Sequence, residues 1–383
     1  MKGASAARRL LTGTAAAAFP VALALGVVVG LLVVVGAPPF QALRYIWTGS
    51  MGGTSRIGDT LMAWVPLTLA GAGLVVTFAA GLWNIGIEGQ IAIGGIAATW
   101  VGRTAPGGAA VLIPLMVLGG AIGGTLWALL AGVLKTKGRV NEIFGGLGLD
   151  FVAGGLAVYL IIGPWKRQGI ASTSGTALLR PAASLPVIGQ TRLSAVAVVM
   201  AAAALVGVYL LMRGTRFGLR LRAVGRNPRS AFLLGIPTDR YLLGAFAVCG
   251  ALAGIAGAIQ VSGVWHKLVP SVSGGYGFLA ILVTLLAAFR AGRIAPIALF
   301  FAIVAVGSAQ LTLLLNLNSA LGGVLQGAVV LFVVLAGGWQ LRRVARRLRG
   351  AEVVVAGGAV AAELTEAAQA QAAPVEQSVA AEP

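Results

Sequence analysis

The sequence predicts an all-α polytopic integral membrane protein, and its composition is the first reason. Of the 383 residues, 58% are hydrophobic and only 10% are charged, whereas soluble domains carry roughly 25% charged residues. Glycine occurs 57 times, about twice its usual share, as expected where helices pack closely in lipid through small residues. The fold should therefore be helical throughout.

The second reason is a series of apolar runs near the length of a membrane-spanning helix. A helix needs about 20 apolar residues to cross a hydrocarbon core of about 30 Å. Ten such segments cover approximately 17–37, 61–80, 84–102, 109–133, 142–163, 193–212, 242–262, 277–289, 294–315 and 319–339. The eighth is short, so we expect it to be tilted or half-embedded. The first resembles a signal peptide, but its apolar run outlasts the usual core of about 7–15 residues, which favours an uncleaved anchor.

The distribution of basic residues predicts the orientation in the membrane. Cytoplasmic loops carry an excess of Lys and Arg. With the N-terminus inside, 20 of the 28 basic residues lie on the cytoplasmic side and 8 lie outside. Ten spans then place both termini in the cytoplasm. The formal net charge of +18 is explained by loops beside lipid headgroups, so we expect membrane lipid and no nucleic acid as a partner.

These patterns divide the chain into successive regions. The transmembrane domain should cover 17–341, with a basic cytoplasmic loop at 213–241. We treat the end of the chain as a disordered acidic tail, because it lacks aromatic residues and holds five of the ten acidic residues. The other predicted regions are a cytoplasmic N-terminus at 1–16, a basic juxtamembrane segment at 342–349 and that tail at 350–383.

The composition also excludes several classes of enzyme. A single histidine, His266, and a single cysteine, Cys249, cannot make a Cys/His zinc cluster, a Ser-His-Asp set or an intrachain disulfide. The phosphate-loop motif G-x-x-x-x-G-K-[ST] does not occur in the sequence, so the chain does not bind ATP by that route. We expect no catalytic residues, no metal and no cofactor in this chain.

The segment 81–90, GLWNIGIEGQ, departs most from a membrane helix. Its glycines would interrupt a helix, and broken helices at membrane depth are tolerated where they face protein or a water-filled cavity. An intramembrane carboxylate such as Glu88 also indicates function. The segment is therefore a candidate lining of a solute pathway. The alternative is a cytoplasmic turn in which Glu88 is solvated or caps the next helix.

A second group of polar residues opens the fifth predicted span. Asn141 and Glu142 stand at its start, where the helix dipole alone favours a carboxylate. Asp150 follows about 12 Å further along the helix. That distance places Asp150 well inside the bilayer, so it should face a cavity or a buried partner.

A short helix is predicted inside the basic cytoplasmic loop. Asn227 is a good N-cap, Pro228 suits the first helical position, and Gly235 followed by Pro237 marks a stop. The apolar residues of this helix need a groove in this chain or in a partner. The alternative is a helix lying on the headgroups, held by Arg222, Arg226 and Arg229.

Small residues recur at intervals of four in Gly250–Gly257. This spacing lets two helix backbones approach closely. It predicts a tight helix contact, either inside the chain or at a seam with a second copy.

Three of these segments resemble the permease subunits of bacterial ABC importers for purine nucleosides. These subunits belong to a wider group that also serves ribose, galactose and branched-chain amino acids. Segment 81–90 is similar to their "G-hydrophobic-F/W-N-I-G-x-E-G-Q" signature. Asn141-Glu142, followed by Tyr159-Leu160 and Gly163-Pro164-Trp165, is similar to their "N-E … Y-L … G-P-W" stretch. Residues 221–236 resemble their cytoplasmic coupling loop, "R-A-V-G-x-N-P-x-A-A-x-x-x-G-I", although Ser230 replaces a frequent Ala. Outside this loop, Asp150 stands where Asn is expected.

The resemblance implies a translocation subunit in the bacterial cytoplasmic membrane, working with three kinds of partner. These are a second homologous permease, an ATPase that holds ATP and Mg, and an extracytoplasmic substrate-binding lipoprotein. The implied substrate pathway includes Trp83, Asn84, Glu88, Gln90, Asn141, Glu142 and Asp150. The implied ATPase-coupling residues are Gly225, Arg226, Asn227, Pro228, Ala231, Phe232, Leu233, Leu234 and Gly235.

Other functions stay open at this point. An ABC permease for ribose, another sugar or branched-chain amino acids is the nearest alternative. A proton-coupled secondary carrier could use the three intramembrane acids Glu88, Glu142 and Asp150. A membrane scaffold without transport activity is disfavoured by the polar residues within the spans.

Overall fold

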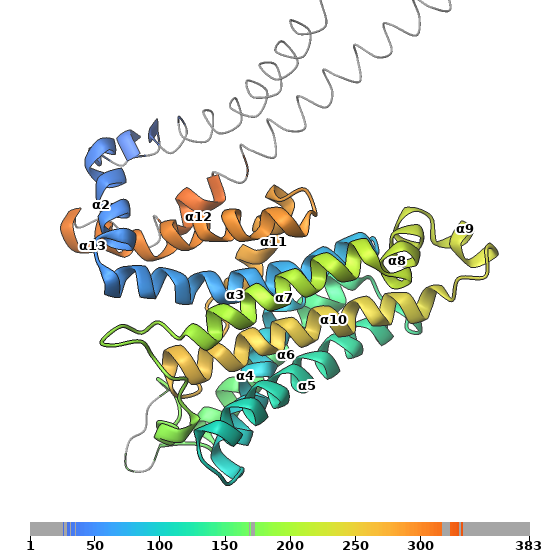
Figure 1. Cartoon of the computed structure of the whole chain (residues 1–383), viewed down its shortest axis with the longest axis horizontal. Helices are drawn as coiled ribbons and strands as arrows, with labels where there is room; N and C mark the ends of the chain where they lie inside the picture. The colour runs from blue at the N-terminus through green and yellow to red at the C-terminus, as the bar shows by residue number, and fades with distance from the viewer. Residues whose placement is uncertain are drawn as a thin grey trace, which may run out of the picture. The chain divides into compact units, whose positions relative to one another are not determined.

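The computed structural model describes residues 36–167, 169, 173–315 and 322–328, together with positions 26, 29, 30, 32–34 and 331. Residues 28–330 form one unit, and the described part of it consists of helices and loops without strands (Figure 1). The predicted all-helical fold is confirmed for these residues. The predicted N-terminal region, the first and tenth spans, the basic segment and the acidic tail lie wholly or largely outside the described residues.

The helices follow one another along the chain, and most of the connections between them are short. Before the predicted basic loop they are α2 (Pro39–Met51), α3 (Thr54–Ala79), α4 (Ile87–Thr104), α5 (Ala109–Thr136), α6 (Glu142–Ile162) and α7 (Ala195–Gly214). After α7 come α8 (Arg216–Arg226), α9 (Pro228–Leu233), α10 (Thr238–Ile259), α11 (Tyr276–Leu286), α12 (Ile294–Gly307) and α13 (Ala309–Leu315). A π-helical turn, Gln260–Trp265, extends α10.

Within the described residues, six helices are long and apolar enough to cross a membrane. They are Thr54–Ala79, Ala109–Thr136, Glu142–Ile162, Ala195–Gly214, Thr238–Trp265 and Ala291–Leu315. The predicted count of ten spans is therefore not confirmed. The predicted segment 84–102 forms α4, whose 18 residues give about 27 Å of helix. The predicted segment 277–289 forms α11, whose 11 residues give only about 16 Å, so the expectation of a short eighth segment is confirmed.

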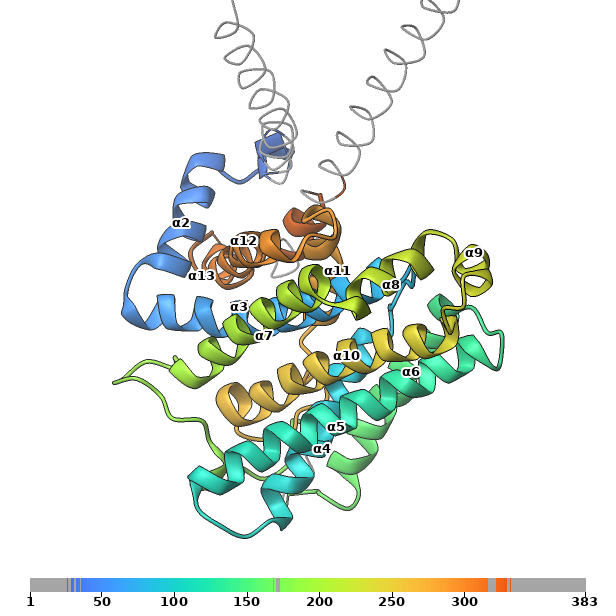
Figure 2. The same ribbon diagram turned by 45° about the vertical axis from the view of Figure 1, so that its right-hand side comes forward.

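Helix α10 lies at the centre of the described unit. It packs against α3, α4 and α5, and Figures 1 and 2 show it between α3 with α7 on one side and α5 on the other. Nearly all of α3 from Gly58 to Thr77 is buried. The core therefore forms around the two most buried spans, α3 and α10.

The glycines of α10 make the tight contact that their spacing predicts. A Cβ atom at Gly254 would lie 2.0 Å from the backbone oxygen of Gly120 on α5. A Cβ atom at Gly257 would lie 2.0 Å from the backbone oxygen of Ile91 on α4. Both contacts are inside the chain, so the first of the two predicted interpretations is confirmed for these positions.

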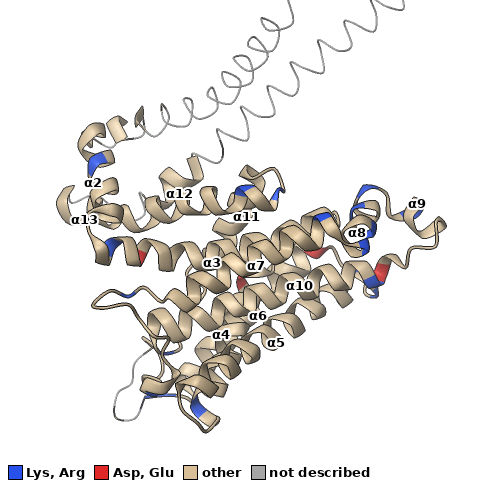
Figure 3. Cartoon of the chain, in the orientation of Figure 1, with Lys and Arg blue, Asp and Glu red and all other residues tan. Residues whose placement is uncertain are grey.

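The predicted basic cytoplasmic loop folds into α8 and α9. In Figure 3 the Lys and Arg positions gather on these two helices and near the ends of other helices. The predicted short helix is α9, and its bounds, Pro228–Leu233, agree with the capping signals in the sequence. The long helical bodies between these ends carry few charges.

Candidate functional site

The 81–90 segment contains the predicted interruption of helix. Helix α3 ends at Ala79 and α4 begins at Ile87. Gly81 has a φ of +75°, and its N–H donates to Phe78 O, while the N–H of Leu82 donates to Thr77 O over 3.0 Å. These bonds close the C-terminus of α3. Residues 80–86 therefore run between two helices without helical structure.

Asn84 and Gln90 bind each other inside this segment. The Asn84 Nδ2 donates to Gln90 Oε1 over 3.1 Å, and the Gln90 Nε2 donates to Asn84 Oδ1 over 2.9 Å. Asn84 Nδ2 also contacts Cys249 Sγ of α10 at 3.1 Å. The two amides are 1% and 0% exposed. Their hydrogen-bonding groups therefore hold the segment to itself and to α10. Trp83, at 43% exposed, is the most accessible of the four pathway candidates in this segment.

Glu88 caps a helix distant in sequence. Its Oε1 accepts from the backbone N–H of Gly275 at 2.9 Å, and its Oε2 accepts from that of Gly277 at 2.7 Å. Gly275 is the N-cap of α11, so the carboxylate satisfies N–H groups that a helix start leaves without partners. The carboxylate therefore binds α11, whereas the alternative interpretation has Glu88 solvated or capping the next helix, α4.

Asp150 caps the start of α4 in the same manner. Its Oδ1 accepts from the backbone N–H of Gly89 at 2.7 Å. The expectation that Asp150 faces a buried partner is therefore confirmed. Its Oδ2 is buried and has no hydrogen-bond partner in the described part of the chain.

Asn141 and Glu142 begin α6. The Asn141 Oδ1 accepts from the N–H of Ile143 at 2.9 Å, which makes Asn141 the N-cap. Glu142 Oε2 pairs with Lys135 Nζ at 2.6 Å. These contacts agree with the helix-start interpretation, and they place both residues at the opening of α6.

The predicted coupling residues form a compact projection. Asn227 Oδ1 accepts from Ser230 N at 3.1 Å and caps α9, and Gly235 has a φ of +76°. Ala231 is buried. Three apolar residues of this projection are exposed: Phe232 at 66%, Leu233 at 85% and Leu234 at 79%. Figure 1 shows α9 at the tip of the unit, beyond α8 and the adjoining end of α10.

Near the end of α8, the backbone at Gly225 packs closely against the backbone of Ala79 and Gly81. A Cβ atom at Gly225 would lie 2.1 Å from the backbone oxygen of Ala79, and one at Gly81 would lie 3.2 Å from the backbone oxygen of Gly225. Arg226, the next residue, is exposed. This contact and the hydrogen bonds of Glu88 and Cys249 join residues far apart in sequence, so the sequence predicts the residue types but not their pairings.

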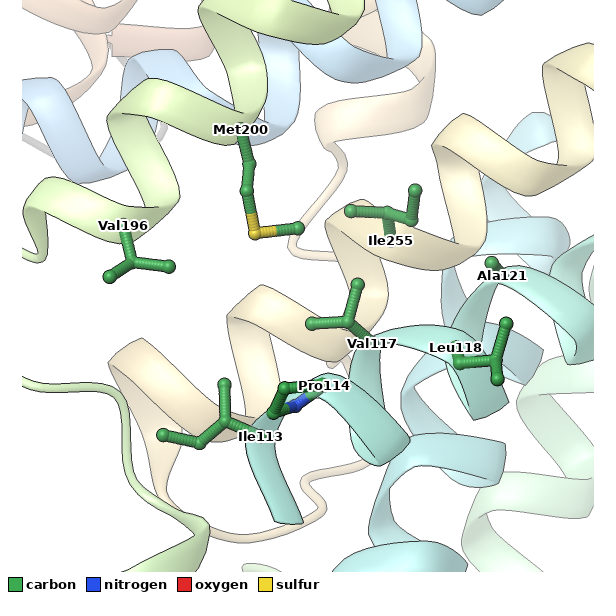
Figure 4. A pocket seen from close by; sticks show the side chains of 8 residues that line it. All are labelled: Ile113, Pro114, Val117, Leu118, Ala121, Val196, Met200 and Ile255. Carbon is green, nitrogen blue, oxygen red and sulfur yellow. The ribbon is translucent and has the colours of Figure 1, made fainter. Parts of the chain in front are cut away.

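A separate groove between α5, α7 and α10 is entirely apolar. Figure 4 shows the side chains that line it: Ile113, Pro114, Val117, Leu118, Ala121, Val196, Met200 and Ile255. None of them can hydrogen-bond a polar solute, so the polar candidates of the 81–90 segment and α6 remain the better site.

Comparison with known proteins gives consistent matches. The family model described as "Branched-chain amino acid transport system / permease component" matches residues 56–334. The glucose ABC transporter permease protein TsgB13 of Haloferax volcanii is 32% identical over 335 residues, covering 85% of this chain and 87% of that protein. The guanosine ABC transporter permease protein NupP of Bacillus subtilis is 27% identical over 334 residues, covering 86% and 95%. The nucleoside ABC transporter permease protein NupB of Lactococcus lactis subsp. cremoris is 26% identical over 303 residues, covering 76% and 83%.

Proposed function

This chain belongs to the branched-chain amino acid transport system permease family and is a permease subunit of an ABC transporter, and on that premise we propose that it imports a purine nucleoside. The observation that carries the proposal is the 81–90 segment, whose sequence resembles the signature of nucleoside permeases. The guanosine and nucleoside permeases among the relatives support it.

A sugar is the second candidate substrate. TsgB13, a glucose permease by its name, matches this chain at 32% identity. A nucleoside and a hexose share a ring with several hydroxyl groups, so the same pathway chemistry could serve either. Uptake competition between the two separates these candidates.

The subunit performs no hydrolysis of its own in this proposal. ATP and Mg are held by a separate ATPase, a second homologous permease completes the pathway, and an extracytoplasmic lipoprotein delivers the solute. Both termini and the basic loop that contains α9 face the bacterial cytoplasm, which agrees with the excess of basic residues on that side.

Helix α9 is the element that meets the ATPase. Phe232, Leu233 and Leu234 are too exposed and too apolar to be left in water. An apolar groove on the ATPase would cover them, and its movement would then be passed to the permease. The exposed Arg222, Arg226 and Arg229 around them would orient this docking.

The solute pathway follows the 81–90 segment and the start of α6. Trp83 offers an accessible aromatic face for a purine ring, and the exposed Asn141 offers an amide. Asn84 and Gln90 shape this wall from behind, since their amides are engaged with each other. Contacts to the solute should be weak, because the subunit must release what it receives.

Uptake of radiolabelled guanosine tests the proposal. Cells that contain the gene should take up guanosine, cells lacking it should not, and unlabelled adenosine should compete while leucine should not. Uptake should survive collapse of the proton gradient if ATP is maintained, which separates the proposal from a proton-coupled carrier. If deletion lowered glucose or ribose uptake and left guanosine uptake unchanged, the nucleoside assignment would be wrong.

The variant Leu233→Asp tests the coupling role of α9. A carboxylate at this exposed position should abolish association with the ATPase without unfolding the permease, because Leu233 is 85% exposed. Leu219→Asp is a matched control, since Leu219 is also an exposed leucine, 66% exposed, on neighbouring α8. Equal ATPase binding by both variants would contradict the assignment.

A further inference from the structure

Two helices of this structure begin inside the protein and need acceptors for their first N–H groups. Helix α11 has 11 residues, about 16 Å, so it cannot cross a core of about 30 Å and one of its ends must lie within the membrane. An unpaired N–H in that environment costs several kcal/mol. Glu88 supplies both acceptors at the start of α11, and Asp150 supplies one at the start of α4.

Glu88 binds the start of α11 through two hydrogen bonds. Each carboxylate oxygen accepts from a different backbone N–H, Gly275 at 2.9 Å and Gly277 at 2.7 Å. Gly277 also packs directly on Glu88, because a Cβ atom at Gly277 would lie 2.8 Å from the Glu88 Cα. Two bonds and a backbone contact fix both distance and direction, so α11 follows the first turn of α4.

The start of α4 is also fixed to the residues that directly precede it in the 81–90 segment. The Asn84–Gln90 amide pair closes across the junction between turn and helix, and Asn84 also contacts Cys249 of α10. All of these atoms are buried. The segment therefore moves with the start of α4 rather than bending independently of it.

The other end of the segment lies against the helix that leads into α9. Gly225 at the end of α8 approaches Ala79 so closely that a Cβ atom there would lie 2.1 Å from the Ala79 oxygen. Only two residues, Arg226 and Asn227, separate Gly225 from α9. Because the contact is between backbones, no side-chain rotation can absorb a displacement of α8.

We propose that Glu88 is a positioning residue that transmits movement of α9 to α11, by the route from Gly225 through the 81–90 segment. This proposal rests on the docking role of α9 proposed above. Glu88 acts on α11 and not on the solute, so its removal should uncouple ATP hydrolysis from import and should leave solute affinity unchanged.

The test uses the complete transporter, with its ATPase, partner permease and binding protein, reconstituted in lipid vesicles. The measured quantity is the number of solute molecules imported per ATP hydrolysed, together with the solute concentration for half-maximal import. Glu88→Leu removes both acceptors, and Glu88→Gln keeps one. Asp59→Asn removes the same charge from the second turn of α3 and serves as the control.

We expect the ratio of import to hydrolysis to fall roughly tenfold or more in Glu88→Leu, the factor expected when a hydrogen bond to a charged group is lost. The fall should be smaller in Glu88→Gln and absent in Asp59→Asn, with half-saturation unchanged throughout. An unchanged ratio in Glu88→Leu would overturn the proposal. A changed half-saturation with an unchanged ratio would also overturn it, because Glu88 would then contact the solute.

A second variant covers the case in which Glu88→Leu fails to assemble. Gly277→Ala places a methyl group 2.5 Å from Glu88 Oε2 and disturbs the contact between Glu88 and α11 from the α11 side. The ratio of import to hydrolysis should therefore fall in this variant too. An unchanged ratio would contradict the proposal. The ratio is measured with whichever solute the wild-type complex imports. A wild-type complex that carries a sugar in place of a nucleoside would therefore refute the substrate assignment without affecting the comparison of variants.

Discussion

Substitution of Gly254 by alanine should destabilise the protein strongly, although alanine is the better helix former. Gly254 lies where α10 crosses α5, and an added Cβ would lie 2.0 Å from Gly120 O, 2.8 Å from Gly120 C and 3.1 Å from Gly124 Cα. All three atoms belong to backbone. The neighbouring helix therefore cannot accommodate the methyl group by changing a side-chain rotamer.

The magnitude follows from these distances. Ordinary van der Waals contact begins at 3.4 Å, so α5 must withdraw by about 1.4 Å, and overpacking typically costs about 1–3 kcal/mol, occasionally more. Gly94 of α4 also packs on Gly254, because a Cβ atom added at Gly94 would lie 2.3 Å from the Gly254 Cα, so α10 is packed closely against α4 as well as α5. We therefore expect a net loss of about 2 kcal/mol, after the gain of about 1 kcal/mol in helix propensity is subtracted from the upper end of that range.

Thermal unfolding of the purified transporter in detergent measures this effect. The loss should lower the melting temperature by about 3 °C in a chain of this length. Gly207→Ala is the matched control, because Gly207 lies inside the α7 span and a Cβ atom added there would have nothing within 4 Å. That variant should melt at or slightly above the wild-type temperature. If both variants melted within about 1 °C of wild type, the close crossing of α5 and α10 would be refuted.

Four further predictions concern the candidate site. Asn84→Ala should lower the melting temperature, because it leaves the buried Gln90 amide without its partner at a cost of about 1–3 kcal/mol. Asp150→Asn should melt near wild type, since an amide oxygen can still accept from Gly89 N, whereas Asp150→Leu should melt lower. Gly225→Ala should lower import per ATP hydrolysed in the vesicle assay, because its methyl group would overlap Ala79 O. Lys135→Met should change the melting temperature only slightly, because Lys135 is 35% exposed in its ion pair with Glu142. The change should be smaller still at high salt, which screens this pair.

Local signals in the sequence predicted the local features of the structure. Asn227, Pro228 and Gly235 gave the two ends of α9, because an N-cap, a first-turn proline and a left-handed glycine act on backbone within a few residues. Gly81 predicted the interruption after α3 for the same reason. The spacing of Gly250 and Gly254 predicted a close crossing but could not name α5 as its partner.

The contacts that join distant segments were not predictable from the sequence. Glu88 is separated from Gly277 by 189 positions, and Asn84 from Cys249 by 165. No periodicity or spacing relates such positions, because their meeting depends on how the helices pack. A carboxylate beside a glycine-rich loop was visible in the sequence, but the helix that it caps was visible only in the fold.

The acidic residues of the described chain show how function and helix chemistry overlap. Glu88, Glu142 and Asp239 each stand in the first turn of a helix, where the dipole favours a negative charge. Taken alone, that position explains all three without a role in transport. Glu88 differs because its carboxylate reaches past its own helix to α11, and Asp150 differs because it lies in the middle of α6 and caps α4. An acid that accepts hydrogen bonds from the first N–H groups of another helix ties the two helices together. Loss of the carboxylate should therefore alter movement between helices at Glu88 and Asp150, and not at the acids that stand at ordinary helix starts.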